Sequence, residues 1–352
     1  MFKTFSSFGS VALAETLIFQ DDFSTFNLKT WKHEITMGGG GNWEFELYHN
    51  SRTNSFVQDG QLYIQPTLTA ETITEQTMMH GSYDVWGGTP ADLCTSNQFY
   101  GCERNAAGSG NYINPIMSAR VRTAESFSFR YGRVEVTAQL PKGDWIWPAI
   151  WLLPTDQAYG SWPVSGEIDL MESRGNGPEC SAGGSNTFAS TLHWGPAWNK
   201  NKYELTHAEY KHSESLGDAM HVYGLLWTED RLITYIDTED NVVLDVDMKT
   251  QSFWEKGGFE GLNPWRGEPN NAPFNQEFYL IMNVAVGGVN GYFPDGMCGK
   301  PWNNASSAAA NDFYNTKGAW YNSWNYPATN QSAMKIDSVK VWSLDGTEAY
   351  SQ

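Results

Sequence analysis

The sequence predicts an all-β protein: a sandwich of two antiparallel sheets joined by long loops. In several segments apolar and polar residues alternate with a period of two, which is the pattern of strands with one buried face. No segment keeps a helical period over three turns, and stretches rich in glycine and asparagine separate the alternating segments. A β-propeller is the alternative all-β fold, but the sequence lacks the repeat spacing that its blades would need.

Four segments are expected to hold the main strands. Each one either alternates apolar with polar residues or forms an apolar run bounded by turn residues, as strands with one or two buried faces do. They are, in chain order, residues 131–140, 220–247, 277–288 and 333–344. Acidic turns at residues 229–230 and 239–240 divide the second segment into successive strands, and a glycine pair ends the third.

The chain is expected to form a single domain, residues 15–352, after a leader at residues 1–14. Its length of 352 residues is large for one domain, but all-β folds often reach about 200–250 residues as one unit, and no linker divides this chain. The leader ends in Ala12-Leu13-Ala14 and is similar to a short secretory signal, with a disordered leader as the alternative. Asn304 and Asn330 begin Asn-x-Ser sequons. Together these features predict a secreted protein.

Charge and composition narrow the class of partner. The formal net charge of -18 argues against nucleic acid and against a sulfated polysaccharide. The sequence has no run of 18 apolar residues, as a membrane-spanning helix would require. The 16 Trp and 17 Tyr favour a sugar ligand, because flat aromatic faces stack on the C–H faces of sugar rings. For any single tryptophan, a place in the core is still the commoner role.

The four cysteines predict two disulfides. A small, even number without a C-x-x-C pair fits a secreted protein, and no Cys/His spacing typical of a zinc site occurs. Four cysteines allow three pairings. The short loop between Cys94 and Cys102 favours joining these two, which leaves Cys180 with Cys298.

The stretch SGEIDLMES, residues 165–173, places three carboxylates in an apolar run. Burying a carboxylate costs free energy, so the placement requires a reason. Glu167 and Asp169 share one face of a strand, whereas Glu172 would point to the opposite face of an ideal strand. On a helix the three side chains would diverge. One extra residue at Leu170–Met171, a β-bulge, would return Glu172 to the face of the other two.

Three carboxylates on one face suit glycoside hydrolysis. A retaining mechanism needs a carboxylate nucleophile and a carboxylic acid about 5–5.5 Å apart, and a third acid between them helps to keep one of them protonated. A solvated acidic patch or a calcium site would explain the spacing alone. Aromatic residues around the cluster favour a sugar cleft, because a metal site would not need them. They are Trp145, Trp147, Trp151, Trp162, Trp194 and Trp198, together with His193.

These motifs resemble those of glycoside hydrolase family 16. SGEIDLMES is similar to the E-x-D-x-x-E signature of the family, in the bulged form found in laminarinases. The resemblance covers nearly the whole chain from residue 17 and includes, in order, SARVRT, WPAIWLLP, TLHWG, MNVAVGG, FPDG and MKIDSVKVW. The loop CTSNQFYGC is also similar to that of animal β-1,3-glucanases and of their glucan-recognition relatives.

The resemblance implies a β-jelly roll with a substrate cleft across its concave sheet. Glu167 matches the nucleophile, Glu172 matches the general acid/base, and Asp169 matches the acid that hydrogen-bonds the nucleophile. His193 matches a supporting residue or a partner on the leaving-group side. Residues implied to contact substrate are Trp147, Trp162, Trp194, Arg122, Asn283 and Trp151, the last being equally suited to the core.

The resemblance further implies one structural calcium and no cofactor for catalysis. Asp337 matches the side-chain ligand of the calcium, with backbone oxygens near Gly60 and at the start of the domain, on the side away from the cleft. We therefore expect a secreted monomer, an endo-1,3-β-glucanase that cuts laminarin-type β-1,3-glucan at internal bonds with retention; transfer of sugar units to a second sugar is left open.

Two alternatives remain open at this point: a non-catalytic glucan-recognition lectin of the same fold, and an agarase-like hydrolase. The lectin is disfavoured because a catalytically silent relative would be expected to lack one or both glutamates. A mixed-linkage glucanase is disfavoured because those relatives usually lack the extra residue of the bulge.

Overall fold

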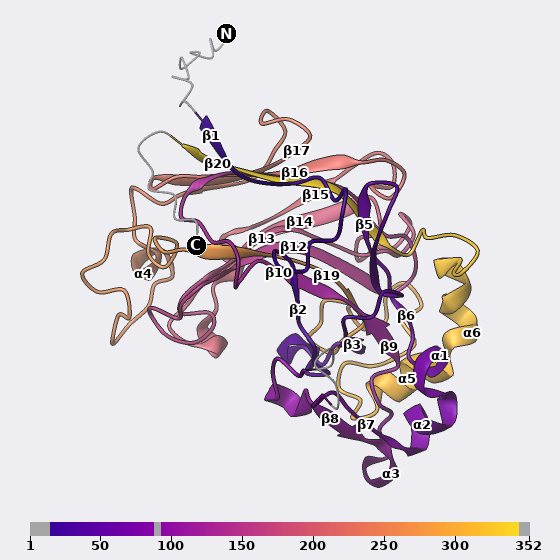
Figure 1. The fold of residues 1–352 in the computed structure, drawn as a ribbon. Helices are drawn as coiled ribbons and strands as arrows, with labels where there is room; N and C mark the ends of the chain where they lie inside the picture. Colours follow the sequence, from indigo (N-terminus) through magenta and orange to yellow (C-terminus); the bar gives the residue numbers. More distant parts are fainter. Residues whose placement is uncertain (1–14, 88–92, 345–352) are drawn as a thin grey trace.

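The structure is a computed structural model of the chain and describes residues 15–87 and 93–344. Two antiparallel sheets lie face to face and form the sandwich that the alternating segments predict (Figure 1). The leader expected at residues 1–14 lies outside the described residues. Within the described ranges, no helix has the length and apolar character needed to cross a membrane.

One sheet has eight strands. Seven follow the order β18-β17-β16-β11-β20-β5-β4, and β1 also pairs with β20. Its strands are β1 (Glu15–Asp21), β4 (Ser55–Gln58), β5 (Gln61–Ile64), β11 (Gly132–Gln139), β16 (His221–Trp227), β17 (Arg231–Ile236), β18 (Val242–Asp247) and β20 (Met334–Leu344). Three of the four segments expected to hold strands, residues 131–140, 220–247 and 333–344, lie in this sheet.

The other sheet has seven strands in the order β15-β14-β13-β12-β19-β10-β2. They are β2 (Lys32–His33), β10 (Arg120–Arg122), β12 (Ile146–Pro154), β13 (Glu167–Ser173), β14 (Thr187–His193), β15 (His207–Lys211) and β19 (Phe278–Val286). Every residue of β19 is buried, which explains why its sequence is apolar without alternation. The acidic strand β13 lies inside this sheet, so β12 and β14 hold it on both sides.

Apolar side chains of the two sheets fill the space between them in one continuous core. Strand β11 shows how the sequence produces it: Val134, Val136 and Ala138 point inward and have no exposed surface, while the intervening residues are only half-buried. More than half of the tryptophans are buried as well, in agreement with the commoner role expected for any one of them.

Short helices and minor strands gather below the two sheets in the view of Figure 1. The helices are α1 (Ala70–Ile73), α2 (Glu75–His80), α3 (Ala106–Ser109), α4 (Phe253–Lys256), α5 (Ala309–Asn315) and α6 (Lys317–Trp320), of which α4 stands apart at the left. The minor strands are β3 (Glu46–Tyr48), β6 (Thr67–Leu68), β7 (Ser82–Asp84), β8 (Glu103–Asn105) and β9 (Ile116–Ser118). The longest described helix, α5, has seven residues, as the absence of a sustained helical period predicts.

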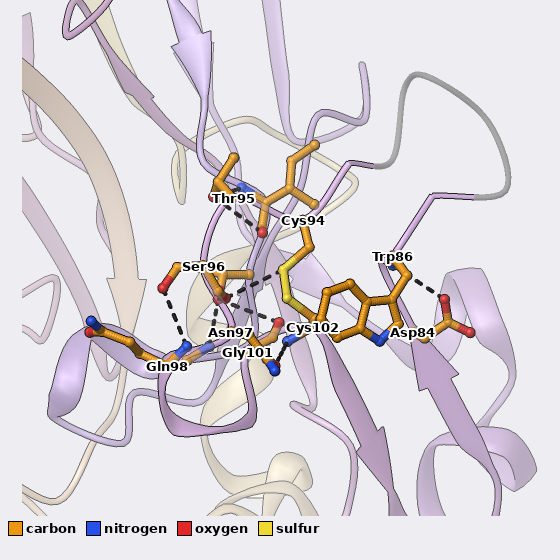
Figure 2. Close-up of a disulfide and its surroundings, with 12 residues drawn as sticks. Asp84, Trp86, Cys94, Thr95, Ser96, Asn97, Gln98, Gly101 and Cys102 are labelled. Atoms are coloured by element: carbon orange, nitrogen blue, oxygen red, sulfur yellow. Dashed lines mark hydrogen bonds between the residues drawn. A yellow bond between two sulfur atoms is a disulfide. The ribbon is translucent and has the colours of Figure 1, made fainter.

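Two disulfides tie the loops together, with the pairing that loop length favours. Cys94 bonds Cys102, and Cys180 bonds Cys298. Figure 2 shows the first of these closing a short loop, within which the backbone N–H of Cys102 donates to Asn97 Oδ1 at 3.2 Å. The second joins two loops that lie 118 residues apart in the chain.

The residues expected to hold calcium lie on the eight-stranded sheet, away from the acids. Strand β20 pairs with β5 as far as Ile336, which lies opposite Leu62, and Asp337 follows directly. Gly60 stands in the turn before β5, at a φ of +73° with open space around it. The turn therefore lies near this part of β20, and backbone oxygens and a carboxylate are of the ligand type that Ca²⁺ takes. Binding of calcium there stays a prediction.

Candidate active site

A β-bulge in β13 brings the three acids to one face of the seven-stranded sheet. Along β12, the consecutive residues Ile150 and Trp151 lie opposite Met171 and Asp169, so β13 has one residue more over this step. The pairing of β13 with β14 shifts at the same place. Leu170 is therefore the extra residue, which confirms the predicted bulge.

The neighbouring strands contribute to the same face, which we call the site face. His193 of β14 lies opposite Glu167. On the other side of β13, Asn283 of β19 lies opposite Ala149 of β12, and Arg120 of β10 lies opposite Asn283. The site face thus runs across β10, β19, β12, β13 and β14, and the acids lie on the fourth of these strands.

An exposed tryptophan holds Glu167 at one end of β13. The indole N–H of Trp162 donates to Glu167 Oε2 at 2.6 Å, although 44% of Trp162 is exposed. Gly166, between them in the chain, has a φ of +84°, and a Cβ there would lie 3.0 Å from the ring of Phe274. A glycine is required at this turn into β13. Trp162 also lies beside His193, with ring centroids 5.7 Å apart.

A buried tryptophan holds Glu172 at the other end. The indole N–H of Trp147 donates to Glu172 Oε1 at 2.9 Å. The Trp147 ring is stacked on Tyr292, with centroids 3.8 Å apart and planes 7° apart. Arg174 lies over Tyr292 at 4.1 Å and donates to its carbonyl oxygen. Trp147 is only 6% exposed, so its ring face is already covered. The expected sugar platform is instead a fixed support for Glu172.

Asp169 lies between the two glutamates and is almost completely buried. Its Oδ2 atom is 3.3 Å from His193 Nε2, yet it makes no hydrogen bond within the described residues. His193 Nδ1 contacts the Asn201 amide nitrogen at 2.7 Å, which fixes the orientation of the imidazole ring. The structure therefore brings His193 to Asp169 and to the Glu167 end of the cluster.

Burial raises the pKa of all three carboxyl groups, because each would carry its charge out of water. The pKa of Glu167 rises to about 8, first through burial and then through the negative charge of Asp169, while His193 and the Trp162 N–H oppose the rise. The pKa of Asp169 lies well above its usual range, from burial and then from Glu172. The cluster therefore retains protons near neutral pH.

A buried polar network extends the site face beyond the residues found from sequence. Asn283 accepts from the Trp151 indole at 2.7 Å and donates to the Tyr48 hydroxyl at 3.0 Å. The Tyr48 hydroxyl donates to Glu44 at 3.4 Å. Arg120 lies over the ring of Tyr48 at 4.5 Å and over that of Trp151 at 5.2 Å. Asn283 and Trp151 thus lie on the site face, as expected, but they are bound to each other.

The sequence pointed to Arg122 but missed Arg120. Arg122 lies farther along β10, opposite Ile281, and pairs with Glu34 at 3.4 Å. Arg120 lies opposite Asn283 and is closer to the network. Both belong to SARVRT and have the same parity, so that motif could have indicated either one. No sequence pattern marked Glu44, Tyr48 or Tyr292.

Two tryptophans near the acids prove to be core residues. Trp194, expected to contact substrate, has no exposed surface: it packs on Phe253 and donates to the Thr206 hydroxyl at 2.8 Å. That prediction is wrong, because Trp194 follows β14 and turns to the core side. Trp145 precedes β12 with a φ of +68° and packs against Trp302, so it does not share the strand face of Trp147.

Exposed aromatic side chains border the site face at both ends. Trp43, next to Glu44, meets Phe99 edge-on, with centroids 5.9 Å apart. At the other end Tyr203 lies against His193, with centroids 5.3 Å apart. Trp198, noted from sequence, is exposed. Nothing in the sequence marked Trp43, Phe99 or Tyr203 as neighbours of the acids, apart from the general excess of aromatic residues.

The cluster could also be considered as a metal site. Glu167, Asp169 and His193 each offer a ligand atom, and these atoms lie within 4.8 Å of one another. A calcium ion takes six to eight oxygen ligands, whereas this set offers two carboxylates and an imidazole nitrogen. The Trp162 N–H, moreover, already occupies an oxygen of Glu167. The donors fit proton transfer better than cation binding.

Comparison with known proteins agrees with this geometry. Residues 95–256 match the model of the glycosyl hydrolases family 16. The chain is 48% identical to the beta-1,3-glucan-binding protein of Penaeus monodon over 94% of this chain and 91% of that protein. It is 31% identical to glucan endo-1,3-beta-glucosidase A1 of Niallia circulans, over 77% of this chain but only 34% of that enzyme.

Among solved structures, the catalytic domain of an endo-1,3-beta-glucanase (laminarinase) from Thermotoga petrophila shares the fold, with a TM-score of 0.60. The two are 22% identical, and the alignment covers 95% of this chain and 100% of that domain. The sandwich fold and the bulged acidic strand are consistent with the similarity to these relatives. The chain belongs to glycosyl hydrolase family 16.

Proposed function

We propose that the protein is a retaining glycoside hydrolase that cleaves laminarin-type β-1,3-glucan. The observation that carries the proposal is the set of three acids on one face of β13, with an indole N–H bound to each glutamate. A retaining mechanism needs one carboxylate to attack and one carboxylic acid to protonate. The names of the Penaeus and Niallia relatives support β-1,3-glucan as the polysaccharide.

In the proposed first step, Glu167 attacks the anomeric carbon and forms an ester with it, while the bond from that carbon to the glycosidic oxygen breaks. Glu172 gives its proton to the leaving oxygen. In the second step Glu172 takes a proton from water, and the water oxygen attacks the same carbon and releases Glu167. Two displacements at one carbon retain the configuration.

Asp169 is proposed to keep a proton while Glu167 loses one. The negative charge of Asp169 is, after burial, the largest cause of the raised pKa of Glu167. A proton held on Asp169 would remove that repulsion, and the Trp162 N–H then favours the charged form of Glu167. The three acids thus divide the roles of nucleophile, proton holder and acid.

Sugar contacts are proposed at the exposed end of the site face. Trp162 offers an exposed ring beside Glu167, and His193 lies next to it. Arg122 and the amide of Asn283 are proposed to hydrogen-bond sugar hydroxyls, although Asn283 would have to exchange a partner within its network. We also propose that the protein is a secreted monomer, that it needs no cofactor for catalysis, and that one calcium binds at Asp337.

A non-catalytic glucan-recognition protein is the second candidate. Several relatives carry glucan-binding names, including the one from Penaeus monodon, and proteins of one fold need not share an activity. Because Glu167, Asp169 and Glu172 are all present and lie together, we favour hydrolysis. An agarase-like activity on the same fold is a third candidate.

A reducing-end assay on laminarin, lichenan, agar and carboxymethylcellulose separates these candidates. We expect release from laminarin above the others, with the β-anomer appearing first in proton NMR spectra of the products. Binding of laminarin without release would favour the recognition protein, and release from agar would favour the agarase. An initial α-anomer would exclude a retaining mechanism.

A further inference from the structure

Two buried hydroxyl groups connect the eight-stranded sheet to the bulge that carries the acids. Ser190 of β14 is 0% exposed and Thr234 of β17 is 1% exposed. The Thr234 hydroxyl donates to Ser190 Oγ at 2.8 Å, and the Ser190 hydroxyl donates to the carbonyl oxygen of Leu170 at 2.7 Å. The chain of bonds therefore ends on the extra residue of β13.

The position of Ser190 is unusual for its residue type. It lies on the core side of β14, between the buried residues Phe188 and Leu192, where an unpaired hydroxyl would cost free energy. A bulge leaves its extra residue outside the regular ladder of hydrogen bonds, so the Leu170 carbonyl needs another donor. Ser190 supplies that donor, and each group satisfies the other.

A second bulge lies at the far end of the chain of bonds. Along β17, the consecutive residues Thr234 and Tyr235 lie opposite Leu244 and Val242 of β18, so Val243 is an extra residue. The Leu244 N–H donates to Thr234 Oγ1 at 3.2 Å. One bulge in each sheet is thus joined to the other through two side chains.

The direction of these bonds is fixed. At one end the backbone N–H of Leu244 can only donate, and at the other end the carbonyl of Leu170 can only accept. Both hydroxyls therefore donate toward β13, so loss of either one breaks the connection between β17 and Leu170. Removing the Thr234 hydroxyl would take from Ser190 Oγ the bond that it accepts, so that the Ser190 side chain is held only by its own bond to Leu170.

We propose that Thr234 and Ser190 are positioning residues that fix the bulge and, through it, hold Glu172 at its place relative to Glu167 and Asp169. The inference rests on the proposed hydrolase function. If the extra residue of a bulged strand moves by one position, the side chains near it turn to the other face of the sheet. Glu172 is two residues from Leu170, so such a shift would affect its direction. The opposite sheet would thereby control the geometry of the acids.

Two variants of Thr234 separate the hydroxyl from the packing. Thr234→Val keeps the shape and loses the hydroxyl, whereas Thr234→Ser keeps the hydroxyl and loses a methyl group. For Thr234→Val we expect kcat on laminarin to fall about 10- to 100-fold, because small misplacements of reacting groups have costs of that size. KM should change little, and the pH profile of kcat/KM should shift. Thr234→Ser should keep a kcat close to that of the unmodified protein.

Ser118→Ala is the matched control. Ser118 of β9 has no exposed surface, and its hydroxyl donates at 2.6 Å to the backbone carbonyl of Val284 in β19 of the seven-stranded sheet. No bulge is involved there. We expect this variant to lower the melting temperature, as loss of a buried hydrogen bond does, and to leave kcat and the pH profile unchanged.

Equal kcat values for Thr234→Val and Thr234→Ser would overturn the inference, and so would a stability loss in Thr234→Val with normal kinetics. If Thr234→Val does not fold, Ser190→Ala is measured in its place against the same control. If the unmodified protein hydrolyses no glucan, the proposed function fails separately. Carbon-13 NMR titration then decides: the inference needs the titration of Glu172 to change in Thr234→Val but not in Ser118→Ala.

Discussion

The two ends of β13 hold their glutamates with the same bond in opposite surroundings. Glu167 accepts from Trp162, whose ring is largely exposed, and Glu172 accepts from Trp147, whose ring is buried under Tyr292. An indole that donates to a carboxylate can therefore be exposed and available to a ligand, as Trp162 is, or buried and part of the core, as Trp147 is. The hydrogen bond is of the same type in both cases, so only the burial of the ring distinguishes the two roles.

The difference matches the proposed division of work. The end of β13 that would form a bond to the sugar is exposed to solvent, so a sugar ring can approach Glu167 beside Trp162. The end that would donate a proton is fixed by Trp147 and by the column of Tyr292 and Arg174 behind it. Changes at the open end should affect ligand binding most, and changes at the fixed end should affect folding or proton transfer.

Replacing either glutamate by glutamine should lower the rate of hydrolysis more than any other change considered below. The two variants should differ, however, in which substrates they still attack. Glu172→Gln should lower kcat on laminarin by about 10²–10⁴-fold, the usual contribution of acid–base catalysis. It should retain formation of the ester from a dinitrophenyl glucoside, whose leaving group needs no proton. Glu167→Gln should lose both reactions, because an amide cannot form the ester.

Steady-state and burst kinetics on the two substrates measure this difference, with Glu209→Gln on β15, the edge strand beyond β14, as the control. The same substrate dependence in Glu167→Gln and Glu172→Gln would contradict the assignment of the two ends.

Trp147→Ala should mainly destabilise the fold. Its ring is 6% exposed and stacked on Tyr292, and truncating a buried tryptophan costs about 3–5 kcal/mol through the cavity that it leaves. Denaturant unfolding of the variant gives this value. A change below about 1 kcal/mol would show that the ring is not part of the core.

Trp162→Ala should mainly weaken binding. By analogy with aromatic stacking on flat ligands, we expect a loss of about 1–3 kcal/mol in transition-state binding, seen in kcat/KM. The melting temperature should change little, because 44% of the side chain is already exposed. A large fall in melting temperature with normal kinetics would assign Trp162 to the core.

The pH dependence of stability should report the cost of burying Glu167. Its pKa is raised to about 8 from the ordinary glutamate value of about 4.5, so between these values the folded protein binds more protons than the unfolded chain. Stability must then fall as pH rises from about 4.5 to about 8. Glu167→Gln removes this loss.

The melting temperature of Glu167→Gln relative to the unmodified protein should therefore increase across that range and then level off. Calorimetry at several pH values checks the trend, again with Glu209→Gln as the control. A constant difference across the range would mean that Glu167 titrates normally.

Much of the sandwich could be predicted, because alternation along β11, β16 to β18 and β20 follows directly from one buried face. The bulge could be predicted for a related reason: three acids in an apolar run can act together as a catalytic cluster only if they share a face, and a bulge gives them one. The cysteine pairing favoured by loop length also matches the structure.

The errors concern residues whose environment depends on the tertiary fold. Trp194 and Trp145 lie just beyond strand ends, where the chain turns and parity no longer predicts the face. The role of Trp147 depends on Tyr292, which is far away in the sequence. The network of Glu44, Tyr48 and Arg120 converges from separate segments, and no periodicity within one segment could reveal it.

The paired bulges at Leu170 and Val243 have a consequence for the history and engineering of this scaffold. Each is a single-residue insertion, and the two are joined through the core. In related sequences, gain or loss of the residue in β13 should accompany a change in β18 or in the Ser190–Thr234 pair. Transplanting the acidic strand alone into an unbulged relative should then fail, while moving both insertions with their hydroxyls should succeed.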